Sequence, residues 1–333
     1  MTPLRIGTRG SLLALAQARS VAAALPGETE LVTITTAGDV DRARGDKSRW
    51  TGALEAALLA DEIDLAVHSA KDVPGELAAG TELVAAPRRA DPLDVLVGER
   101  TLAAVREGAR VGTSALRRRA QLLAARPDLE IAEVRGNVDT RLRKRAAGEV
   151  DVLVLAAAGL ERLGRRGEAG GSPAGEVFVP AAGQGVIAVQ ARTGSPAAEA
   201  AFTVNHDRTL ACLTAERAAV RELEASCHAP VGIHAEGVTN SLRLRGFAGL
   251  PDGSAWLVDE LVWNIPGHGD RETPGPGDPG HGDRETPGPG DPGHGDRKAP
   301  ALGDAAAAGE ALARRMRAAG AADLLRDAEA MVT

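Results

Sequence analysis

The sequence predicts a multidomain α/β protein, and three observations support that prediction. The chain has 333 residues, of which 44% are hydrophobic, so it can form two or three packed domains. Residues 1–90 alternate short β-branched or Leu-rich runs with Ala/Leu-rich helical stretches, which is typical of a parallel sheet covered by helices. Near residue 205 this pattern gives way to a long helical stretch, so we expect a separate third region.

The N-terminal elements follow from local signals. Residues 4–6 predict a strand and residues 7–10 a turn. Ser11 is expected to cap the next helix, because its hydroxyl can accept a free backbone N–H of the first turn. Residues 52–59 predict a helix and residues 65–67 a buried strand.

Two short segments of this first part recur later in the chain. Residues 5–8 (RIGT) are echoed by 110–113 (RVGT), and residues 64–67 (DLAV) by 151–154 (DVLV). Because both echoes keep their order, they indicate two similar α/β domains, although matches this short also arise by chance in an Ala-rich chain.

The last third of the chain is different in composition. A Gly-Gln-Gly turn leads into residues 186–190. Residues 207–225 predict a helix, and residues 305–330 one amphipathic helix packed on the sheet of the third region. Between them a 13-residue unit rich in Pro, Gly and charge is repeated, and we expect residues 265–300 to be a disordered loop.

Metal binding by the repeated segment is conceivable, because His268, His281 and His294 recur at one spacing. Tandem duplication alone explains that spacing, so no metal site is predicted. Two cysteines, Cys212 and Cys227, are also too few for a disulfide framework or a zinc site made of cysteines.

Composition excludes several classes of protein. The chain has no long apolar run, so we expect no membrane partner. Arg5 and Gly7 occur before any hydrophobic stretch could form, which predicts no secretory signal and a cytoplasmic location. A net charge of −7 and an aromatic content of 2% argue against nucleic acid as a partner.

The charge is nevertheless uneven along the chain. Residues 106–166 hold 14 Lys and Arg against 8 Asp and Glu, a local excess of six positive charges. Such a cluster in an acidic protein indicates a polyanionic ligand.

A candidate catalytic carboxylate lies where a predicted strand ends. Asp72 lies in residues 68–74 (HSAKDVP), which start as a strand and then break, and parallel-sheet proteins present side chains to ligands from such positions. The carboxylate could move protons, and Lys71 beside it could bind an anion. A surface ion pair is the alternative.

Arginines follow several predicted turns. Arg117 and Arg118 come after the turn at 112–114, where helix N–H groups would also favour carboxylates or phosphates. Arg135 and Arg141 flank a second turn at Gly136. A solvated basic face is the alternative interpretation.

The two cysteines have different surroundings. Cys227 lies where the predicted helix gives way to a Pro-Gly loop, so its thiol could be a nucleophile favoured by His228, or simply a small residue at a helix end. Cys212 lies among apolar helix residues and is expected to pack in the core.

Together these segments closely resemble the hydroxymethylbilane synthase family, also called the porphobilinogen deaminase family, over nearly the whole chain. The resemblance rests on residues 6–11 with Gln17, 68–74, 111–118, 135–141, 158–164, 183–185 and 227–232.

The resemblance implies three domains. Two similar, bilobed, periplasmic-binding-protein-like α/β domains would comprise residues 1–90 with about 183–203, and 91–182. A smaller α+β C-terminal domain would comprise residues 204–333.

The implied activity is the stepwise condensation of four porphobilinogen molecules with release of ammonia, giving hydroxymethylbilane for tetrapyrrole synthesis. Cys227 would hold a dipyrromethane cofactor through a thioether, and Asp72 would be the catalytic acid and base. The residues expected to bind substrate and cofactor are Arg9, Ser11, Gln17, Lys47, Ser69, Lys71, Thr113, Ser114, Arg117, Arg118, Arg135, Arg141, Gly159 and Arg162.

Other implications concern a loop, the oligomer and a rival function. Lys47 and Trp50 align with a loop thought to cover the site, and the family expectation is a monomer. The alternative is a non-enzymatic bilobed protein that binds a small anion, which would need the arginines but neither Asp72 nor Cys227.

Overall fold

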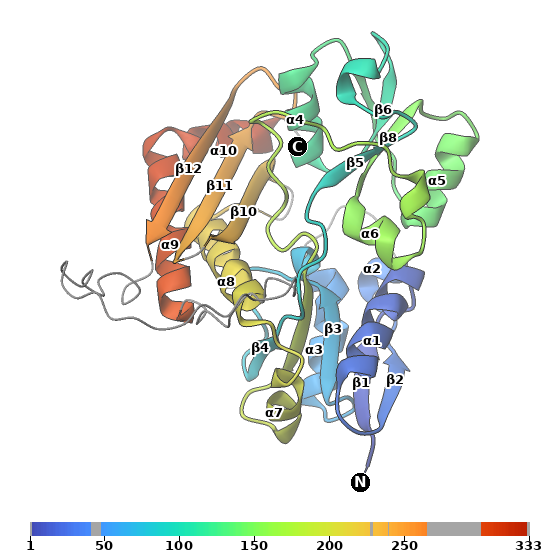
Figure 1. Cartoon of the computed structure of the whole chain (residues 1–333), viewed down its shortest axis with the longest axis vertical. Helices are drawn as coiled ribbons and strands as arrows, with labels where there is room; N and C mark the ends of the chain where they lie inside the picture. The colour runs from blue at the N-terminus through green and yellow to red at the C-terminus, as the bar shows by residue number, and fades with distance from the viewer. Residues whose placement is uncertain (1, 41–47, 227–228, 239, 265–300, 332–333) are drawn as a thin grey trace, which may run out of the picture.

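Three β-sheets organise the chain. The computed structural model describes residues 2–40, 48–226, 229–238, 240–264 and 301–331. Each sheet, with the helices packed on it, forms a lobe, and the three lobes surround the centre of the molecule (Figure 1). The predicted α/β class is confirmed.

The first lobe is built on a five-stranded sheet of order β2-β1-β3-β9-β4. Its elements are β1 (Leu4–Thr8), α1 (Leu12–Ala24), β2 (Thr29–Thr33), α2 (Ala37–Val40), α3 (Ser48–Leu59), β3 (Leu65–Ser69), β4 (Thr81–Ala85), β9 (Ile187–Arg192) and α7 (Pro196–Phe202). β1 pairs in parallel with β2 and β3, whereas β9 runs antiparallel to β3 and β4. The chain therefore leaves this sheet after β4 and returns to it as β9.

The second lobe is built on a four-stranded sheet of order β5-β8-β6-β7. Its elements are β5 (Asp94–Val97), β6 (Arg110–Gly112), α4 (Leu116–Ala125), β7 (Glu130–Ala132), α5 (Val138–Ala146), β8 (Val152–Ala156) and α6 (Ala157–Arg162). β6 pairs in parallel with β7 and β8, and β5 is antiparallel to β8.

The two echoed sequence segments occupy equivalent strands of these lobes. The first echo lies on β1 and on β6, and the second lies on β3 and on β8. In each lobe the two strands that carry the echoes pair in parallel: β1 with β3, and β6 with β8. The equivalence extends to a side chain: Asp64 accepts the Arg5 backbone N–H at 2.8 Å, and Asp151 accepts that of Arg110 at 2.8 Å. This shared arrangement favours the duplication over a chance match.

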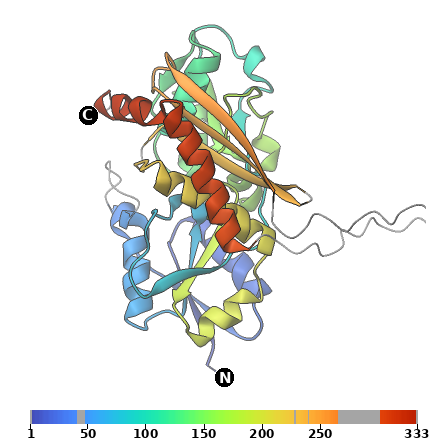
Figure 2. The same cartoon turned by 90° about the vertical axis from the view of Figure 1, so that its left-hand side faces the viewer.

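The third lobe is an antiparallel sheet of β10 (Val231–Val238), β11 (Ser241–Gly249) and β12 (Trp256–Asn264) beside α8 (Asp207–Glu222), α9 (Leu302–Ala318) and α10 (Ala321–Ala330). α9 runs along the sheet (Figure 2). It lies very close to α8, because a Cβ added at Gly309 would be 2.0 Å from the Ala215 carbonyl oxygen. Small residues on both helices allow this approach.

The prediction of one helix over residues 305–330 was wrong. Gly320 adopts a left-handed conformation with φ +98°, which glycine reaches without steric cost, and separates α9 from α10. The repeated segment 265–300, with its three histidines, lies outside the described residues.

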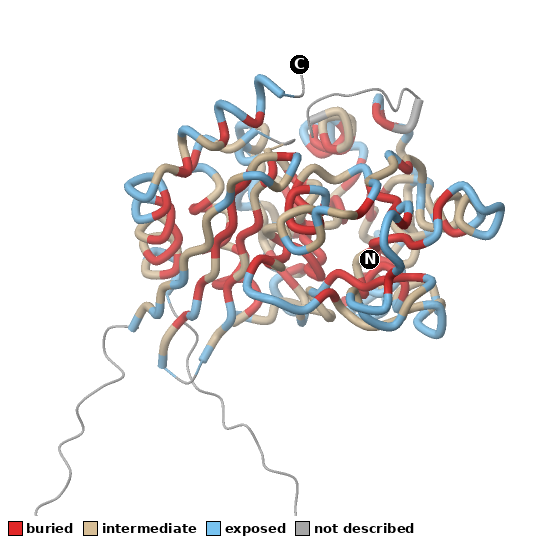
Figure 3. Tube along the Cα trace, turned by 90° about the horizontal axis from the view of Figure 1, so that it is seen from above, coloured by how far each residue is buried: buried red, intermediate tan, exposed pale blue. Residues whose placement is uncertain are grey.

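Burial follows the sheets (Figure 3). Buried residues run along the strands and inner helix faces, while turns and outer helix faces are exposed. Within the described ranges, no helix combines the length and apolar character needed to cross a membrane.

Candidate active site

A cavity of about 880 Å³ lies at the meeting point of the three lobes. We call it the central cavity. Eleven of the fourteen binding residues predicted above line this cavity, together with the proposed catalytic carboxylate Asp72. The predicted residues that line the cavity are Arg9, Ser11, Gln17, Ser69, Lys71, Asp72, Ser114, Arg118, Arg135, Arg141, Gly159 and Arg162.

Strand ends and helix starts of the first lobe form one wall. Ser11 caps α1 as predicted, and its Oγ accepts the Ala14 N–H at 3.2 Å. Gln17, six residues after Ser11 on α1, shares hydrogen bonds of 2.9 and 3.0 Å with the Ser69 hydroxyl at the end of β3. The helix and the strand are thereby joined at the cavity.

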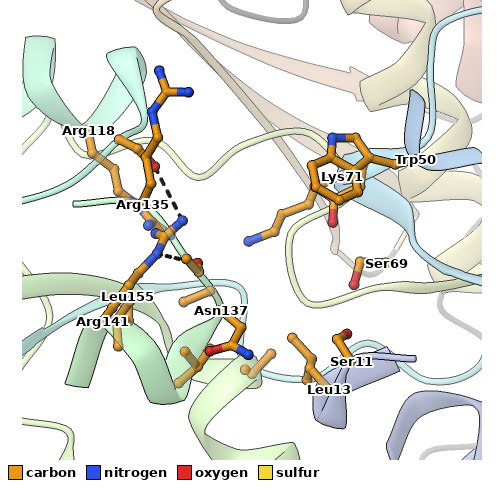
Figure 4. A pocket seen from close by; sticks show the side chains of 18 of the residues that line it. Ser11, Leu13, Trp50, Ser69, Lys71, Arg118, Arg135, Asn137, Arg141 and Leu155 are labelled. Carbon is orange, nitrogen blue, oxygen red and sulfur yellow. Dashed lines mark hydrogen bonds between the residues drawn. The ribbon is translucent and has the colours of Figure 1, made fainter. Parts of the chain in front are cut away.

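The 3₁₀ turn Ala70–Asp72 follows β3 directly and brings Lys71 and Asp72 to the cavity. Burial, together with the positive charge of Arg118, lowers the pKa of Lys71 to about 8. Its Nζ donates to Gln184 Oε1 at 3.4 Å. Lys71 reaches into the cavity from one wall and Arg141 from the opposite wall (Figure 4).

Arg141 is held by the turn that precedes α5. Its Nε donates to the Gly136 carbonyl at 2.8 Å and its Nη2 to Ser114 Oγ at 3.2 Å (Figure 4). Gly136 has φ +122°, a conformation that favours glycine. Burial and the neighbouring Arg118 lower the pKa of Arg141 to about 10.

Two further arginines of the second lobe border the cavity. Arg162 Nη2 donates to the Gly185 carbonyl at 2.7 Å, which ties α6 to the segment where the chain returns to the first lobe. Arg135 lies beside Glu133, with Nη2 2.7 Å from Oε1. Their guanidinium groups and that of Arg141 give this wall its positive charge.

Arg117 and Arg118 do not act alike, contrary to expectation. Asp94, at the start of β5, forms ion pairs with both: its Oδ2 lies 2.8 Å from Arg117 Nη1 and its Oδ1 lies 2.8 Å from Arg118 Nη2. Arg117 also donates to the Val179 carbonyl at 2.9 Å and is not among the residues that line the cavity, so its contact with a ligand stays a prediction. Arg118 reaches the cavity while bound to Asp94.

The charge of Asp94 is stabilised by this pairing. Burial alone would raise the pKa of the Asp94 carboxyl, but the charges of Arg117 and Arg118 hold it far below its usual value. Asp94 therefore neutralises part of the buried positive charge that Arg117 and Arg118 bring.

Thr113 is also not among the cavity-lining residues. It is 4% exposed, and its Oγ1 accepts the Ala115 N–H at 3.1 Å, so it shapes the turn before α4. A hydroxyl engaged by the backbone at a buried position explains why this predicted contact residue lies outside the cavity.

Trp50 covers Arg9 at the edge of the first lobe. The ring centroid lies 4.0 Å from Arg9 Cζ, a distance suited to a cation–π interaction. Gly38 makes room for the ring, because an added Cβ would be 2.4 Å from it. Lys47, the basic residue predicted in the same loop, lies outside the described residues.

Cys227 also lies outside the described residues, but its neighbours on both sides line the central cavity: Ser226, Ala229 and Pro230. They follow the C-terminal end of α8. Cys212 is buried in the core of the third lobe, as predicted, and burial raises the pKa of its thiol to about 12.

Sequence reasoning missed a buried charge that connects the third lobe to the chain segments at Arg89 and Gly183. Glu216 on α8 accepts the Gly183 N–H at 2.6 Å, Arg89 Nη1 at 2.6 Å and the Ala235 N–H at 2.7 Å. Burial opposes its ionisation, yet Arg89 and His234 lower the pKa of Glu216 to about 2. A charged residue in the apolar pattern of α8 was the available signal.

Gln184 was noticed only as part of a Gly-Gln-Gly turn. Its Nε2 donates to Asp94 Oδ1 at 2.9 Å and to the Pro92 carbonyl at 2.7 Å, while its Oε1 faces Lys71 and Arg118. Gln184 thus links Lys71 of the first lobe to Arg118 of the second. The pattern of apolar residues in the sequence does not reveal these long-range contacts of Gln184.

The site can therefore do two things chemically. Its arginines and Lys71 can bind several carboxylates at once, since planar guanidinium groups pair well with carboxylates. Asp72, facing the same space, can exchange protons with a bound molecule.

Comparison with known proteins is consistent with this chemistry. Residues 4–200 match the family model described as porphobilinogen deaminase, dipyromethane cofactor binding domain, and residues 210–269 match the model of the porphobilinogen deaminase C-terminal domain.

Curated relatives carry the same name. The porphobilinogen deaminase of Roseiflexus sp. (strain RS-1) is 48% identical over 263 residues, which is 75% of this chain and 87% of the relative. That of Rubrobacter xylanophilus is 47% identical over 267 residues, covering 76% and 86%, and that of Deinococcus radiodurans is 43% identical over 270 residues, covering 76% and 87%.

Among solved structures, the immunogenic lipoprotein A of Vibrio vulnificus aligns with 62% of this chain and 96% of its own at 14% identity, with a TM-score of 0.40. The family models span most of the chain, and several relatives exceed 40% identity over three quarters of it. The chain therefore belongs to the porphobilinogen deaminase family.

Proposed function

We propose that the protein is a hydroxymethylbilane synthase. It joins four porphobilinogen molecules head to tail, releases one ammonia for each, and builds the chain on a covalently attached dipyrromethane primer. The observation that carries this proposal is the gathering of Asp72, Lys71 and four second-lobe arginines around one cavity that also reaches both sides of Cys227.

The residues present fit a bound dipyrromethane. Each pyrrole of this chemistry carries two carboxylates, and the central cavity offers cationic groups on opposite walls. When bound through Cys227, the cofactor supplies the free pyrrole carbon to which the next ring is joined. The flanking Ser226 and Ala229 support this attachment point, because both border the cavity.

The side chains would divide the work between binding and proton transfer. Arg9, Arg118, Arg135, Arg141 and Arg162 would bind acetate and propionate groups, with Lys71, Ser11, Ser69 and Ser114. Asp72 would protonate the leaving amino group of porphobilinogen, stabilise the cation left as ammonia departs, and accept the pyrrole proton after the carbon–carbon bond forms.

The structure modifies the role that we propose for Arg117. Its donors are used by Asp94, Gln121 and the Val179 carbonyl. We therefore propose that Arg117 positions Arg118 through their shared Asp94 instead of binding a carboxylate of the substrate.

The domain boundaries are part of the proposal. Residues 1–90 with about 183–203 would form domain 1, residues 91–182 domain 2 and residues 204–333 domain 3, in keeping with the three sheets. Action as a monomer in the cytoplasm, without nucleic acid or a membrane as partner, stays a prediction.

The intact mass of the purified protein tests the proposal. Protein made in cells that supply porphobilinogen should carry two pyrrole units, and the Cys227→Ser variant should carry none. The matched Cys212→Ser variant should keep the adduct, because the Cys212 thiol is buried in the core. An unmodified native chain would favour the alternative of a non-enzymatic anion-binding protein.

A further inference from the structure

An acidic side chain lies among the arginines of the central cavity. Glu133 follows β7 and lines the cavity together with Arg118, Arg135, Arg141 and Arg162. A carboxylate on this wall repels the acidic groups of the proposed substrate, so its presence needs an explanation.

The contact that Glu133 makes is specific. Its Oε1 accepts Nε of Arg135 at 2.8 Å and lies 2.7 Å from Nη2. Nε and Nη2 form the edge of a guanidinium that a ligand carboxylate would bind with two parallel hydrogen bonds. Glu133 thus occupies the edge of Arg135 that the substrate would use.

The pair is also easy to separate. The side chains of Arg135 and Glu133 are 40% and 56% exposed, and ion pairs this exposed are weak because water screens them. Asp94 is different, since its side chain and those of Arg117 and Arg118 are at most 10% exposed. Asp94 is a permanent partner of its arginines, whereas Glu133 can be displaced.

We infer that Glu133 is a built-in competitor of the substrate carboxylate at Arg135, and that it sets the affinity of this subsite. In the free protein the Glu133 carboxylate pairs with the Arg135 guanidinium. A carboxylate of the substrate displaces it, and Glu133 pairs with Arg135 again when the ligand dissociates. No bond is made or broken in this exchange. The inference rests on the proposed function and adds to it a residue that tunes affinity without touching the reacting atoms.

The test compares Glu133→Gln with a matched control. Glu130, at the start of β7, accepts Arg110 Nε at 3.1 Å, with side chains that are 62% and 49% exposed, but neither residue lines the cavity. Glu130→Gln therefore removes a similar ion pair away from the site. We expect Glu133→Gln to lower KM for porphobilinogen by about two- to fivefold without raising kcat, and Glu130→Gln to change neither.

The dependence of KM on salt concentration is a second measurement. A purely structural role of Glu133 would not change this dependence. In the native protein, added salt weakens both the substrate contact and the competing Glu133 contact, so the two effects partly cancel. In Glu133→Gln only the substrate contact is weakened. We therefore expect KM of the variant to rise more steeply with salt than KM of the native protein.

Two outcomes would overturn the inference while leaving the proposed function intact. An unchanged KM in Glu133→Gln would show that no competition occurs, and a raised KM would show that Glu133 orients Arg135 for the substrate. If the native protein did not consume porphobilinogen, the proposed function would fail instead. Calorimetric binding of propane-1,2,3-tricarboxylate still tests the competition, with tighter binding to Glu133→Gln expected and equal or weaker binding contradicting it.

Discussion

Arg217 on α8 donates through Nη2 to the Pro74 carbonyl at 2.8 Å and to the Gly75 carbonyl at 3.0 Å. These carbonyls follow Asp72 by two and three residues. One guanidinium of the third lobe therefore holds the loop that carries the proposed catalytic carboxylate of the first. Because Ser226 at the cavity follows the same helix, α8 connects both parts of the proposed chemistry.

Loss of the Arg217 contact should affect turnover more than binding. We expect Arg217→Met to lower kcat by about tenfold to 100-fold with a smaller change in KM, because a small displacement of a catalytic group is costly. Arg217→Lys should recover part of kcat. Arg221, one turn further along α8, is the control, and Arg221→Met should behave like the native protein. Equal loss in both variants would point to general damage to the helix.

Asp72→Asn tests the proton-transfer role. The amide has nearly the same shape but cannot exchange a proton, so we expect ammonia release to fall by about 10²- to 10⁴-fold. Circular dichroism and thermal unfolding should match the native protein, because Asp72 lies at the cavity and not in a core cluster. Ammonia release at the native rate would contradict the assigned role.

The lowered pKa of Lys71 predicts how the affinity for substrate depends on pH. Burial lowers its pKa to about 8, so the ammonium is present below pH 8 and is lost as the pH rises above that value. We expect KM to rise about tenfold per pH unit above this point, because only the charged form attracts a carboxylate. In Lys71→Arg the charge persists, so the rise in KM should disappear between pH 8 and 9. The same rise in both proteins would assign it to another group.

Asp94→Asn should destabilise the second lobe. It leaves Arg117 and Arg118 buried without a counter-charge, which costs about 3–5 kcal/mol of unfolding free energy. Glu260→Gln is the control, since it breaks an exposed pair with Arg243 and should change stability by about 1 kcal/mol or less. Urea denaturation of both variants measures the difference, and equal effects would show that the buried network contributes no more than the surface pair.

Local sequence determined the elements and much of the site. Ser11 caps α1 because a hydroxyl at that position satisfies a backbone donor within the same turn. Ser69 lies at the cavity because it ends a buried strand, and Lys71 and Asp72 because they follow it directly; the sequence shows this strand end as a break after an apolar run. Such signals depend on residues only a few positions apart.

Tertiary structure alone determined which charged side chains line the cavity and which are paired elsewhere. Arg117 and Arg118 are adjacent on α4 and both pair with Asp94 of β5, yet only Arg118 reaches the cavity, while the Val179 carbonyl also holds Arg117. Arg217 is likewise recognised as functionally relevant only through its contact with the distant Pro74 carbonyl. The energy of a charge depends on its burial and on the distance to its partner, and both are set by how distant segments pack.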